Sequence, residues 1–423
     1  MKRKDVVQCL VAALVIFLVP ALGIGAAPAK TKVSVWEWLS TQGEGPVINA
    51  VIEDYAKKNP NVEIERLPTP WPPAHDKLLM MSMANEMPDL IAVNRNWLVE
   101  FGSMGMLEDL TPYIDSVPGM RAKYFEPVRG ELDGKVLIVP YSGGNSALVY
   151  NKKVFAQKGL TPPKTLDEFM VTARKLTDPS KQEYGIQLGM SEKNSTGANV
   201  CNFGPLLYTF GGKYVENRKA AFNSDAGVKT MQWMIDLEKV QKVAAPGTIS
   251  VDPKAMRESL AGGKTFMSFD GAWGTPFYSK FTDLDIGIAQ MPKGAKTGTV
   301  INIMCWGISK TSKNKQAAWD LLAYICNDAN MLKLSREANA LPIIRKQAEL
   351  PEFQAKFKGF TDTLAASDNF FQTGSIPQET ELYNIIVAAY QEAFLGTKTA
   401  KAALDDAAVK YNQVLAKFYA AVK

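Results

Sequence analysis

The residues of this chain that offer the most binding chemistry are its tryptophans. An indole presents a flat apolar face and one N–H donor. Such a face can cover the C–H face of a sugar ring while nearby polar side chains bond the hydroxyl groups. Core packing is the other common use of a tryptophan. The tryptophans that fall at expected strand ends or in loops, and are therefore candidates, are Trp36, Trp38, Trp71, Trp97, Trp273 and Trp306.

Trp273 is the strongest of these candidates. It follows an expected strand, Phe266 to Phe269, and stands between Gly271 and Gly274. A backbone without side chains can approach a ligand closely, so this tryptophan is well placed to contact one. Two further aromatic candidates follow the same argument: Trp306 and Tyr383. Trp233 and Trp319 fall inside expected helices, and we expect them to be structural.

Polar candidates come from the loops near these aromatic residues. An amide bonds hydroxyl groups without carrying charge, which suits a neutral ligand. Arg345 can alternatively pair with a carboxylate or phosphate of a ligand. The remaining ligand-binding candidates are Asn94, Asn96, Asp270, Tyr141, Asn145, Glu44, Trp38 and Arg345.

Enzyme and metal chemistry has few candidate residues. His75 is the one histidine, so a histidine-dependent triad has a single possible base, and we expect His75 to be a solvated loop or helix-start residue. The sequence has no phosphate-binding loop, dinucleotide fingerprint, HExxH motif or paired CxxC motif. We therefore expect no catalytic residue, no metal and no cofactor. Scattered carboxylates leave a glycosidase pair open.

The first elements of the chain are expected to bring several loops to one edge of a sheet. Short links between alternating strands and helices predict a parallel sheet with right-handed crossovers. Ligands of open parallel sheets bind beyond the carboxyl ends of the strands. The expected order is strand 32–38, a helix opened by Pro46, strand 62–67, helix 76–85 and strand 89–93. The carboxyl ends of the strands then lie at 38–45, 67–71 and 94–97.

The next part of the chain is expected to pass between two structural units. Val136 to Val139 is an apolar run that we expect to end at Pro140, because proline lacks the N–H of a central strand. Ser142-Gly143-Gly144 would let the chain change direction before a new strand starts at Ala147. Further on, Thr165 with Glu168 three residues later predicts a capping box at the start of a helix.

The order of residues in this part resembles the crossover segment of family 1 extracellular solute-binding proteins, the group that contains maltose-binding protein. The likeness extends from about residue 32 to the C-terminus. The matching residues of the crossover are Gly134-Lys135, Pro140, Tyr150-Asn151-Lys152, Pro162-Pro163, Thr165, Glu168 and Phe169.

The resemblance implies an α/β, two-lobed periplasmic-binding-protein fold of type II. Each lobe would be a mostly parallel sheet flanked by helices, and crossover segments would form a hinge. The N-terminal lobe would contain residues 30–142 and 300–340, and the C-terminal lobe residues 143–299 and 341–423. Hinge segments would lie near 140–146, 296–306 and 335–345.

The resemblance also bears on single site residues. In sugar-binding members the counterpart of Trp273 stacks on the ligand. Asn94 and Asn96 stand where the family commonly shows an Asp or another hydrogen-bonding residue. Tyr383 follows an IPQ segment like that of maltose-binding protein, where the matching aromatic residue is a tryptophan.

Length and the N-terminus indicate an exported, two-lobed chain. The 423 residues exceed the ~250–300 at which single cores stop growing. Residues 1–29 read as a cleavable signal peptide, with Lys30 as the mature start. An uncleaved membrane anchor is the alternative, although the apolar run is short for one. The signal features are basic Lys2, Arg3 and Lys4, an apolar run from Cys9 to Ile24, and small residues at Ala27-Pro28-Ala29.

The charge balance bears on the class of binding partner, and the cysteine content bears on disulfide bonds. Without the signal segment, the 48 basic and 43 acidic residues fall to 45 and 42, a net charge of +3, which does not indicate nucleic acid. Cys201, Cys305 and Cys326 remain, an odd number without close spacing, so we expect buried thiols rather than a disulfide framework.

The sequence therefore favours a monomeric periplasmic binding component of an ABC importer. It would capture a sugar or oligosaccharide between its lobes and deliver it to the membrane permease. Two alternatives remain open. One is a secreted carbohydrate-active enzyme, a hydrolase or lyase. The other is the same fold with a different ligand, such as glycerol phosphate, a polyamine or a metal.

Overall fold

The computed structural model describes residues 30–38, 44–71, 73–124 and 130–421. The expected signal peptide lies outside the described residues. The strands are β1 (Thr31–Glu37), β2 (Val62–Pro68), β3 (Leu90–Asn94), β4 (Gly130–Leu132), β5 (Lys135–Asn151), β6 (Tyr184–Ile186), β7 (Val215–Glu216), β8 (Lys219–Ala220), β9 (Thr265–Gly271), β10 (Ile286–Ala289), β11 (Gly298–Ile308) and β12 (Asn369–Gln372).

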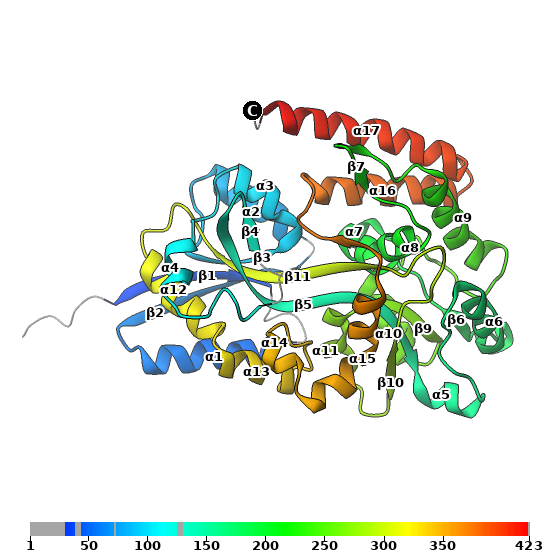
Figure 1. Cartoon of the computed structure of the whole chain (residues 1–423), viewed down its shortest axis with the longest axis horizontal. Coiled ribbons are helices and arrows are strands. Elements are labelled where there is room, and N and C mark those ends of the chain that lie inside the picture. Colours follow the sequence, from blue (N-terminus) through cyan, green and yellow to red (C-terminus); the bar gives the residue numbers. More distant parts are fainter. Residues whose placement is uncertain (1–29, 39–43, 72, 125–129, 422–423) are drawn as a thin grey trace, which may run out of the picture.

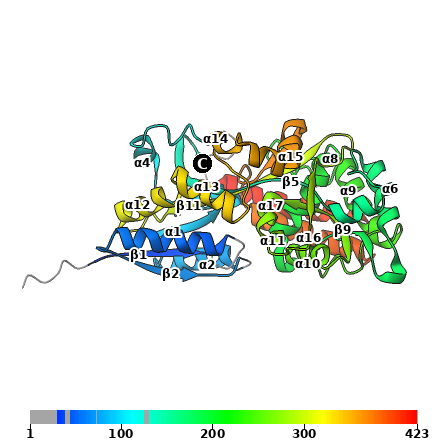
Figure 2. The ribbon, with the colours of Figure 1, turned by 90° about the horizontal axis from the view of Figure 1, so that it is seen from below.

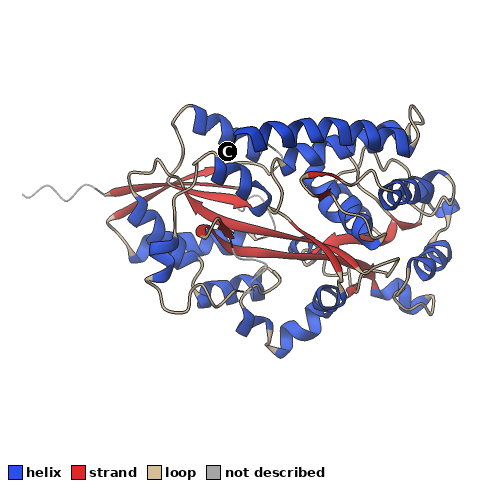
Figure 3. Ribbon diagram, turned by 45° about the horizontal axis from the view of Figure 1, so that its top comes forward, coloured by secondary structure: helices blue, strands red, loops and turns tan. Residues whose placement is uncertain are grey.

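Helices surround these strands on both sides (Figure 3). The α-helices are α1 (Gly45–Lys58), α2 (Ala74–Met83), α3 (Leu98–Ser103), α4 (Thr111–Asp115), α5 (Lys152–Gln157), α6 (Leu166–Leu176), α7 (Ser195–Ala198), α8 (Gly204–Thr209), α9 (Asp225–Lys239), α10 (Pro253–Ala261), α11 (Thr275–Tyr278), α12 (Lys315–Ile325), α13 (Asp328–Glu337), α14 (Arg345–Ala348), α15 (Pro351–Ala366), α16 (Glu379–Phe394) and α17 (Ala400–Ala421). Two short 3-10 turns also matter for the site: η2 (Arg95–Trp97) and η7 (Ala272–Gly274).

Within the described residues, one sheet of ten strands runs through the whole molecule. Its order is β2-β1-β3-β11-β5-β9-β6, with β4 and β10 paired to β5 and β12 paired to β11. β1 pairs in parallel with both β2 and β3, which confirms the expected parallel start. The fold class is α/β, as expected.

The expected break at Pro140 is wrong, because β5 is one continuous strand of 17 residues. Pro140 lies where the register between β5 and β11 shifts, between Met304 and Cys305, so a bulge absorbs its missing N–H. The glycines serve close packing of the strands rather than a turn. Gly143 has a φ of +134°, and a Cβ there would come 2.5 Å from the carbonyl oxygen of Asn302 on β11.

β5 and β11 connect the two halves of the molecule. They pair antiparallel from Ile301 with Asn145 to Trp306 with Val139. Figure 1 shows them side by side across the middle, and Figure 2 shows β1 and β2 at the opposite end from β9. The strand expected at Met304 starts earlier, at Gly298.

Buried apolar residues form two large clusters, which define what we call the first and second lobes. The first cluster draws on residues 33–141 and 301–344. The second draws on residues 148–300 and 371–415. The exact lobe boundaries stay a prediction.

Local sequence signals explain the ends of several helices. Pro46 stands in the first turn of α1, and Asn59 follows its last residue. The capping box at α6 is confirmed: Thr165 Oγ1 accepts from the Glu168 N–H at 3.2 Å, and the Glu168 carboxylate accepts from the Lys164 N–H at 2.7 Å. Among the described residues the cysteines are buried and unpaired, as expected.

Candidate functional site

A cavity of about 420 Å³ lies between the lobes, at the carboxyl ends of β1, β2 and β3. Its size and its mixture of apolar and polar walls are typical of small-molecule sites. The first lobe lines it with Trp38, Pro70, Trp71 and Asn94, and β11 adds Asn302 and Met304. The second lobe contributes Asn194, Thr196, Gly197, Val200, Asp252, Pro253, Lys254, Arg257, Trp273, Phe277 and Lys280.

Three of the residues expected at the site line this cavity: Trp38, Asn94 and Trp273. They come from β1, β3 and β9 or directly follow these strands. The strand-end argument therefore brought together residues that are far apart in the sequence.

Tryptophans form the first-lobe wall of the cavity. Trp71 lies flat against Trp97, with ring centroids 5.5 Å apart and an interplanar angle of 8°. Trp38 is fully buried and meets both rings edge-on, at 4.9 and 5.4 Å. Trp38 therefore supports the wall more than it offers an open face.

Trp273 lies on the second-lobe side, in η7 directly after β9. Its ring folds back over Gly271, where any Cβ would collide with the indole. A Cβ at Gly274 would likewise collide with Asp270 and Arg257. The two glycines therefore let the indole lie against the end of the strand, where it is half-buried and borders the cavity.

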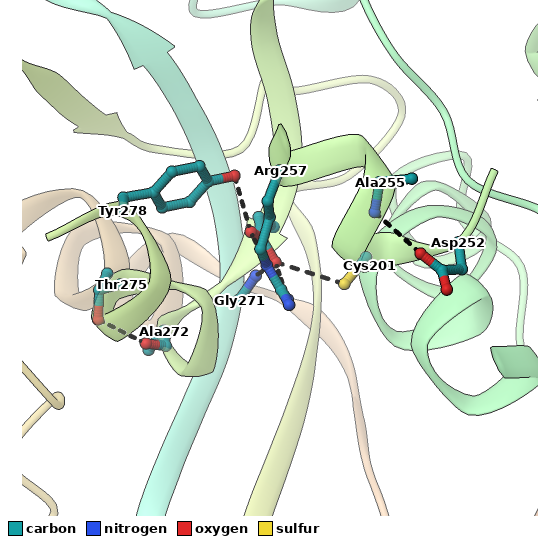
Figure 4. Close-up of polar contacts among 9 residues, drawn as sticks. Cys201, Asp252, Ala255, Arg257, Gly271, Ala272, Thr275 and Tyr278 are labelled. Carbon is teal, nitrogen blue, oxygen red and sulfur yellow. Dashed lines mark hydrogen bonds and ion pairs between the residues drawn. The ribbon is translucent and has the colours of Figure 1, made fainter. Parts of the chain in front are cut away.

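Asp270 does not line the cavity; it holds Arg257, which does. Figure 4 shows Arg257 with Tyr278 and Cys201 on either side. Its two carboxylate oxygens accept from Arg257 Nε and Nη2, each at 2.8 Å. Tyr278 Oη donates to the same carboxylate at 3.0 Å and Cys201 Sγ at 3.5 Å. Burial alone lowers the pKa of Arg257, but the charge and hydrogen bonds of Asp270 raise it above its usual value. The guanidinium is thus fixed and charged at the edge of the cavity.

Glu44 is buried at the start of α1. It does not line the cavity, but it lies close enough to Arg257 and Lys280 for their charges to affect its carboxyl group. Desolvation raises the pKa of its carboxyl group. A hydrogen bond with the Glu44 backbone opposes that shift, as do the Ser142 hydroxyl at 3.5 Å and the charges of Arg257 and Lys280. Its role at the site stays a prediction.

Asn94 and Asn96 leave polar atoms without partners among the described residues. Asn94 Oδ1 accepts from the Asn96 N–H at 3.1 Å. Asn94 Nδ2 and both polar side-chain atoms of Asn96 are buried and have no partner there. Buried polar groups are normally hydrogen-bonded, so these atoms are available to a ligand or to water. Of the two residues, Asn94 lines the cavity and Asn96 does not.

The other expected site residues lie outside the cavity. Trp306 is fully buried in the first lobe beside Tyr141, at a ring distance of 5.8 Å. Tyr141 does not line the cavity, and its Oη donates to Sδ of Met304, which does, at 3.3 Å. Asn145 is used at the hinge, where its Nδ2 donates to the Phe360 carbonyl at 3.1 Å.

Tyr383 and Arg345 also lie elsewhere. Tyr383 is fully buried in α16, and its hydroxyl donates to Glu379 at 2.6 Å. Arg345 borders a different cavity, of about 580 Å³, and its Nε donates to the Tyr124 carbonyl at 3.3 Å.

Several cavity residues were not expected from the sequence: Arg257, Lys254, Lys280, Asn194, Thr196, Phe277 and Asn302. Most belong to second-lobe segments without a strand-end signal. For Lys254 and Arg257 the sequence offers one local signal, the N-cap at Asp252, which marks the start of α10. Its carboxylate accepts from the Ala255 N–H at 2.9 Å. Trp71 had such a signal, because it ends the loop after β2.

Metal binding has no support in the part of the chain that the structure describes. No group of three or more His, Cys, Asp or Glu residues there could hold a metal ion. His75 begins α2 as expected, but it is not solvated: its ring nitrogens lie 2.9 Å from Asp76 and 2.9 Å from Glu100. It does not line the cavity.

Comparison with known proteins agrees with this geometry. The sequence model of the bacterial extracellular solute-binding protein family matches residues 50–361. The chain belongs to this family. The resemblance noted in the crossover segment is thereby confirmed, and the family is one of binding proteins.

Two relatives show how far the likeness of this solute-binding protein extends. The maltotriose-binding protein of Pyrococcus abyssi is 23% identical over 332 residues, covering 76% of this chain and 69% of that protein. The galactooligosaccharide-binding protein of Bacillus subtilis is 24% identical over 366 residues, covering 83% of each.

Solved structures share the fold. An ABC transporter solute-binding protein of Thermotoga lettingae, bound with alpha-D-tagatose, matches with a TM-score of 0.83 and 24% identity, covering 91% of this chain and all of that one. A maltose-bound protein of T. maritima matches with a TM-score of 0.81 and 21% identity, at the same coverage. These likenesses confirm the two-lobed type II fold. No helix among the described residues is long and apolar enough to cross a membrane.

Proposed function

We propose that this solute-binding protein captures a sugar or oligosaccharide in the cavity between its lobes and delivers it to the permease of an ABC importer. The half-buried Trp273 carries this proposal, since its ring is held against Gly271 at the edge of an interlobe cavity. The maltotriose-binding and galactooligosaccharide-binding relatives support the ligand class.

The polar side chains around the cavity suit hydroxyl groups. Among the described residues, Asn94 Nδ2 is an amide donor without a partner, and Nη1 of Arg257 is not one of the two nitrogens that bond Asp270. Because Asp270 neutralises Arg257, the pair can donate hydrogen bonds without demanding a charged ligand. Glu44 and Asn96 do not line the cavity, and we propose that they contribute to ligand binding from beside it.

The cellular setting is part of the same proposal. We infer export by the N-terminal segment 1–29, a monomer in the periplasm, lobes at 30–142 plus 300–340 and 143–299 plus 341–423, and neither nucleic acid nor turnover of the ligand. The family supports a location outside the cytoplasm. The two apolar clusters support this division along most of the chain, but Ile343 and Ile344, which it puts in the C-terminal lobe, belong to the first cluster.

Calorimetric titration of the purified chain against maltotriose, a galactooligosaccharide, D-tagatose and ribitol tests the function. We expect binding of at least one of these probes, with no product detectable by chromatography after hours. Mass spectrometry of ligand retained through purification extends the test to other sugars. Release of product would favour the secreted-enzyme alternative, and retention of a polyamine or glycerol phosphate would overturn the sugar assignment.

A further inference from the structure

Trp71 is a first-lobe tryptophan whose position is set by other aromatic rings. One face is covered by Trp97, which stacks on it at 8°. Behind Trp97 lie Phe101 and His75, with ring centroids 5.5 and 5.4 Å from that of Trp97. Trp38 also meets Trp71 edge-on, with ring centroids 4.9 Å apart. Trp71 is nevertheless only half-buried and borders the cavity, so the surface that Trp97 and Trp38 leave uncovered is what it offers there.

Trp71 also reaches across the cavity. Its Nε1 donates to Asn194 Oδ1 of the second lobe at 3.4 Å. The same oxygen accepts from the Gly197 N–H at 2.9 Å, which holds it in place. Asn194 and Gly197 border the same cavity as Trp71 and Trp273. An indole from each lobe therefore faces one space, and one of the two indoles is hydrogen-bonded to the opposite lobe.

We propose that Trp71 is the first-lobe stacking surface for a sugar ring, and that its indole N–H links this surface to the second lobe through Asn194. The inference rests on the proposed function, which it deepens by naming a second aromatic contact. Stacking needs only the ring face, while the link needs only the N–H. The two roles can therefore be separated by substitution.

Replacement of Trp71 by Phe or by Ala separates them. Trp71→Phe keeps an aromatic face but loses the donor, so affinity for the best-bound of maltotriose, galactooligosaccharide, D-tagatose and ribitol should fall about 2- to 10-fold. Trp71→Ala loses both and should weaken binding about 30-fold or more. Asn194→Asp keeps the acceptor oxygen for both donors and should stay closer to wild type than Asn194→Ala.

Trp233 provides a matched control. It is a half-buried tryptophan of α9 that packs on Phe169 and Phe210, away from this cavity. Trp233→Ala should leave affinity within about twofold even if the melting temperature falls. If Trp71→Ala binds as tightly as Trp233→Ala while the wild type binds a probe, the stacking role is overturned and the proposed function stands.

A measurement without ligand tests the link. In small-angle scattering, ligand-free Trp71→Phe should have a larger radius of gyration than the wild type, because the two lobes lose a bond between them. Equal radii would overturn the link. Failure of the wild type to bind any of the four probes would overturn the sugar assignment and, with it, the stacking role.

Discussion

At the scale of single residues, Trp273 makes the sharpest prediction for ligand binding. Its ring is half-buried against Gly271 and borders the cavity. Replacement by Ala should remove an aromatic anchor worth about 2–4 kcal/mol of binding. At 1.4 kcal/mol per decade, affinity should fall about 30- to 700-fold in calorimetric titration.

The thermal stability of Trp273→Ala is the control for this loss of affinity. A side chain that lines an open cavity loses less on truncation than a core residue. Thermal melting of Trp273→Ala should therefore show a smaller drop than truncation of fully buried Trp306. A large drop in melting temperature with affinity nearly intact would assign Trp273 to packing.

His75 makes a second prediction, about pH rather than ligand. Burial by itself lowers the pKa of His75, but hydrogen bonds and charges of Glu100 and Asp76 outweigh it, so the pKa is raised. Folded His75 thus holds its proton more tightly than the unfolded chain. This stabilisation is fully present below the unfolded pKa of about 6.5 and is lost as pH rises through the folded pKa.

Denaturant melts of His75→Gln at several pH values check this. The difference in unfolding free energy from wild type should be largest near pH 5.5 and shrink toward pH 8.5. Affinity for a sugar should change less than about twofold, because His75 lies outside the cavity. A difference that does not vary with pH would refute the ion-pair account, and a large loss of affinity would put His75 in the site.

The sequence could identify some of these residues and not others, for a physical reason. Trp38 and Asn94 stand at the carboxyl ends of β1 and β3, which are parallel, so these ends lie together. Trp273 follows β9, a second-lobe strand that runs opposite to β3 through β5 and β11, and it meets the other two because the lobes face each other. Trp306 and Tyr383 have the same ring chemistry, but burial depends on what packs over them. Trp306 is covered by the first-lobe core, and Tyr383 by Glu379 and Tyr214. No local pattern contains those neighbours.

At the scale of elements, β5 shows where local signals mislead. Proline and paired glycines usually interrupt a strand. Here β5 itself forms a bulge next to Pro140, because Tyr141 has no partner between the pairs Ser142–Met304 and Pro140–Cys305, and β11 brings its backbone close to Gly143. The capping box of α6, in contrast, is local to the five residues 164–168, and the sequence predicts it correctly.

Near the hinge, η2 of the first lobe contacts the segment that leads into α16 of the second lobe. The third prediction concerns Glu379, the first residue of α16. Arg95 of the first lobe donates to the Thr373 carbonyl, next to Gly374, whose N–H donates to Glu379 at 2.8 Å. Desolvation raises the pKa of Glu379 to about 8, against the opposing effects of Tyr383, Gly374 and Arg95. Glu379 is therefore a buried acid that holds its proton at neutral pH.

The sign of the resulting pH dependence follows from linkage. Above the unfolded pKa of about 4.5, the unfolded chain loses the proton that folded Glu379 keeps until about pH 8. Its contribution to stability therefore falls between those values, by at most about 1.4 kcal/mol per pH unit. Glu379→Gln removes the proton and keeps the shape.

Denaturant melts from pH 5 to pH 8 test this prediction. Glu379→Gln should gain stability relative to wild type as pH rises. Glu381→Gln, an exposed position on the same helix, is the matched control and should track the wild type. A parallel pH profile for Glu379→Gln and wild type would mean that Glu379 is ionised in the folded protein at neutral pH.

At the scale of the whole molecule, the arrangement of two lobes on one sheet predicts motion. The lobes share β5 and β11, and polar contacts between them are found at the hinge, from Arg95 to Thr373, and at the cavity, from Trp71 to Asn194. The segment before α14 is a third connection, tied to the second lobe where Thr275 Oγ1 donates to the Asn339 carbonyl at 2.6 Å. Rotation about β5, β11 and the segment before α14 can open the cavity while each core stays intact, and opening must break the hydrogen bond from Trp71 to Asn194.

A ligand that touches both lobes should therefore favour the closed arrangement, because only that arrangement lets it contact Trp71 and Trp273 together. Small-angle scattering with saturating sugar should show a smaller radius of gyration than the free protein. Trp273→Ala at the same sugar concentration should stay close to the free radius, since it loses the second-lobe contact and much of the affinity. An unchanged radius for wild type at proven saturation would mean that the lobes do not close on the ligand, and the clamshell account would be wrong.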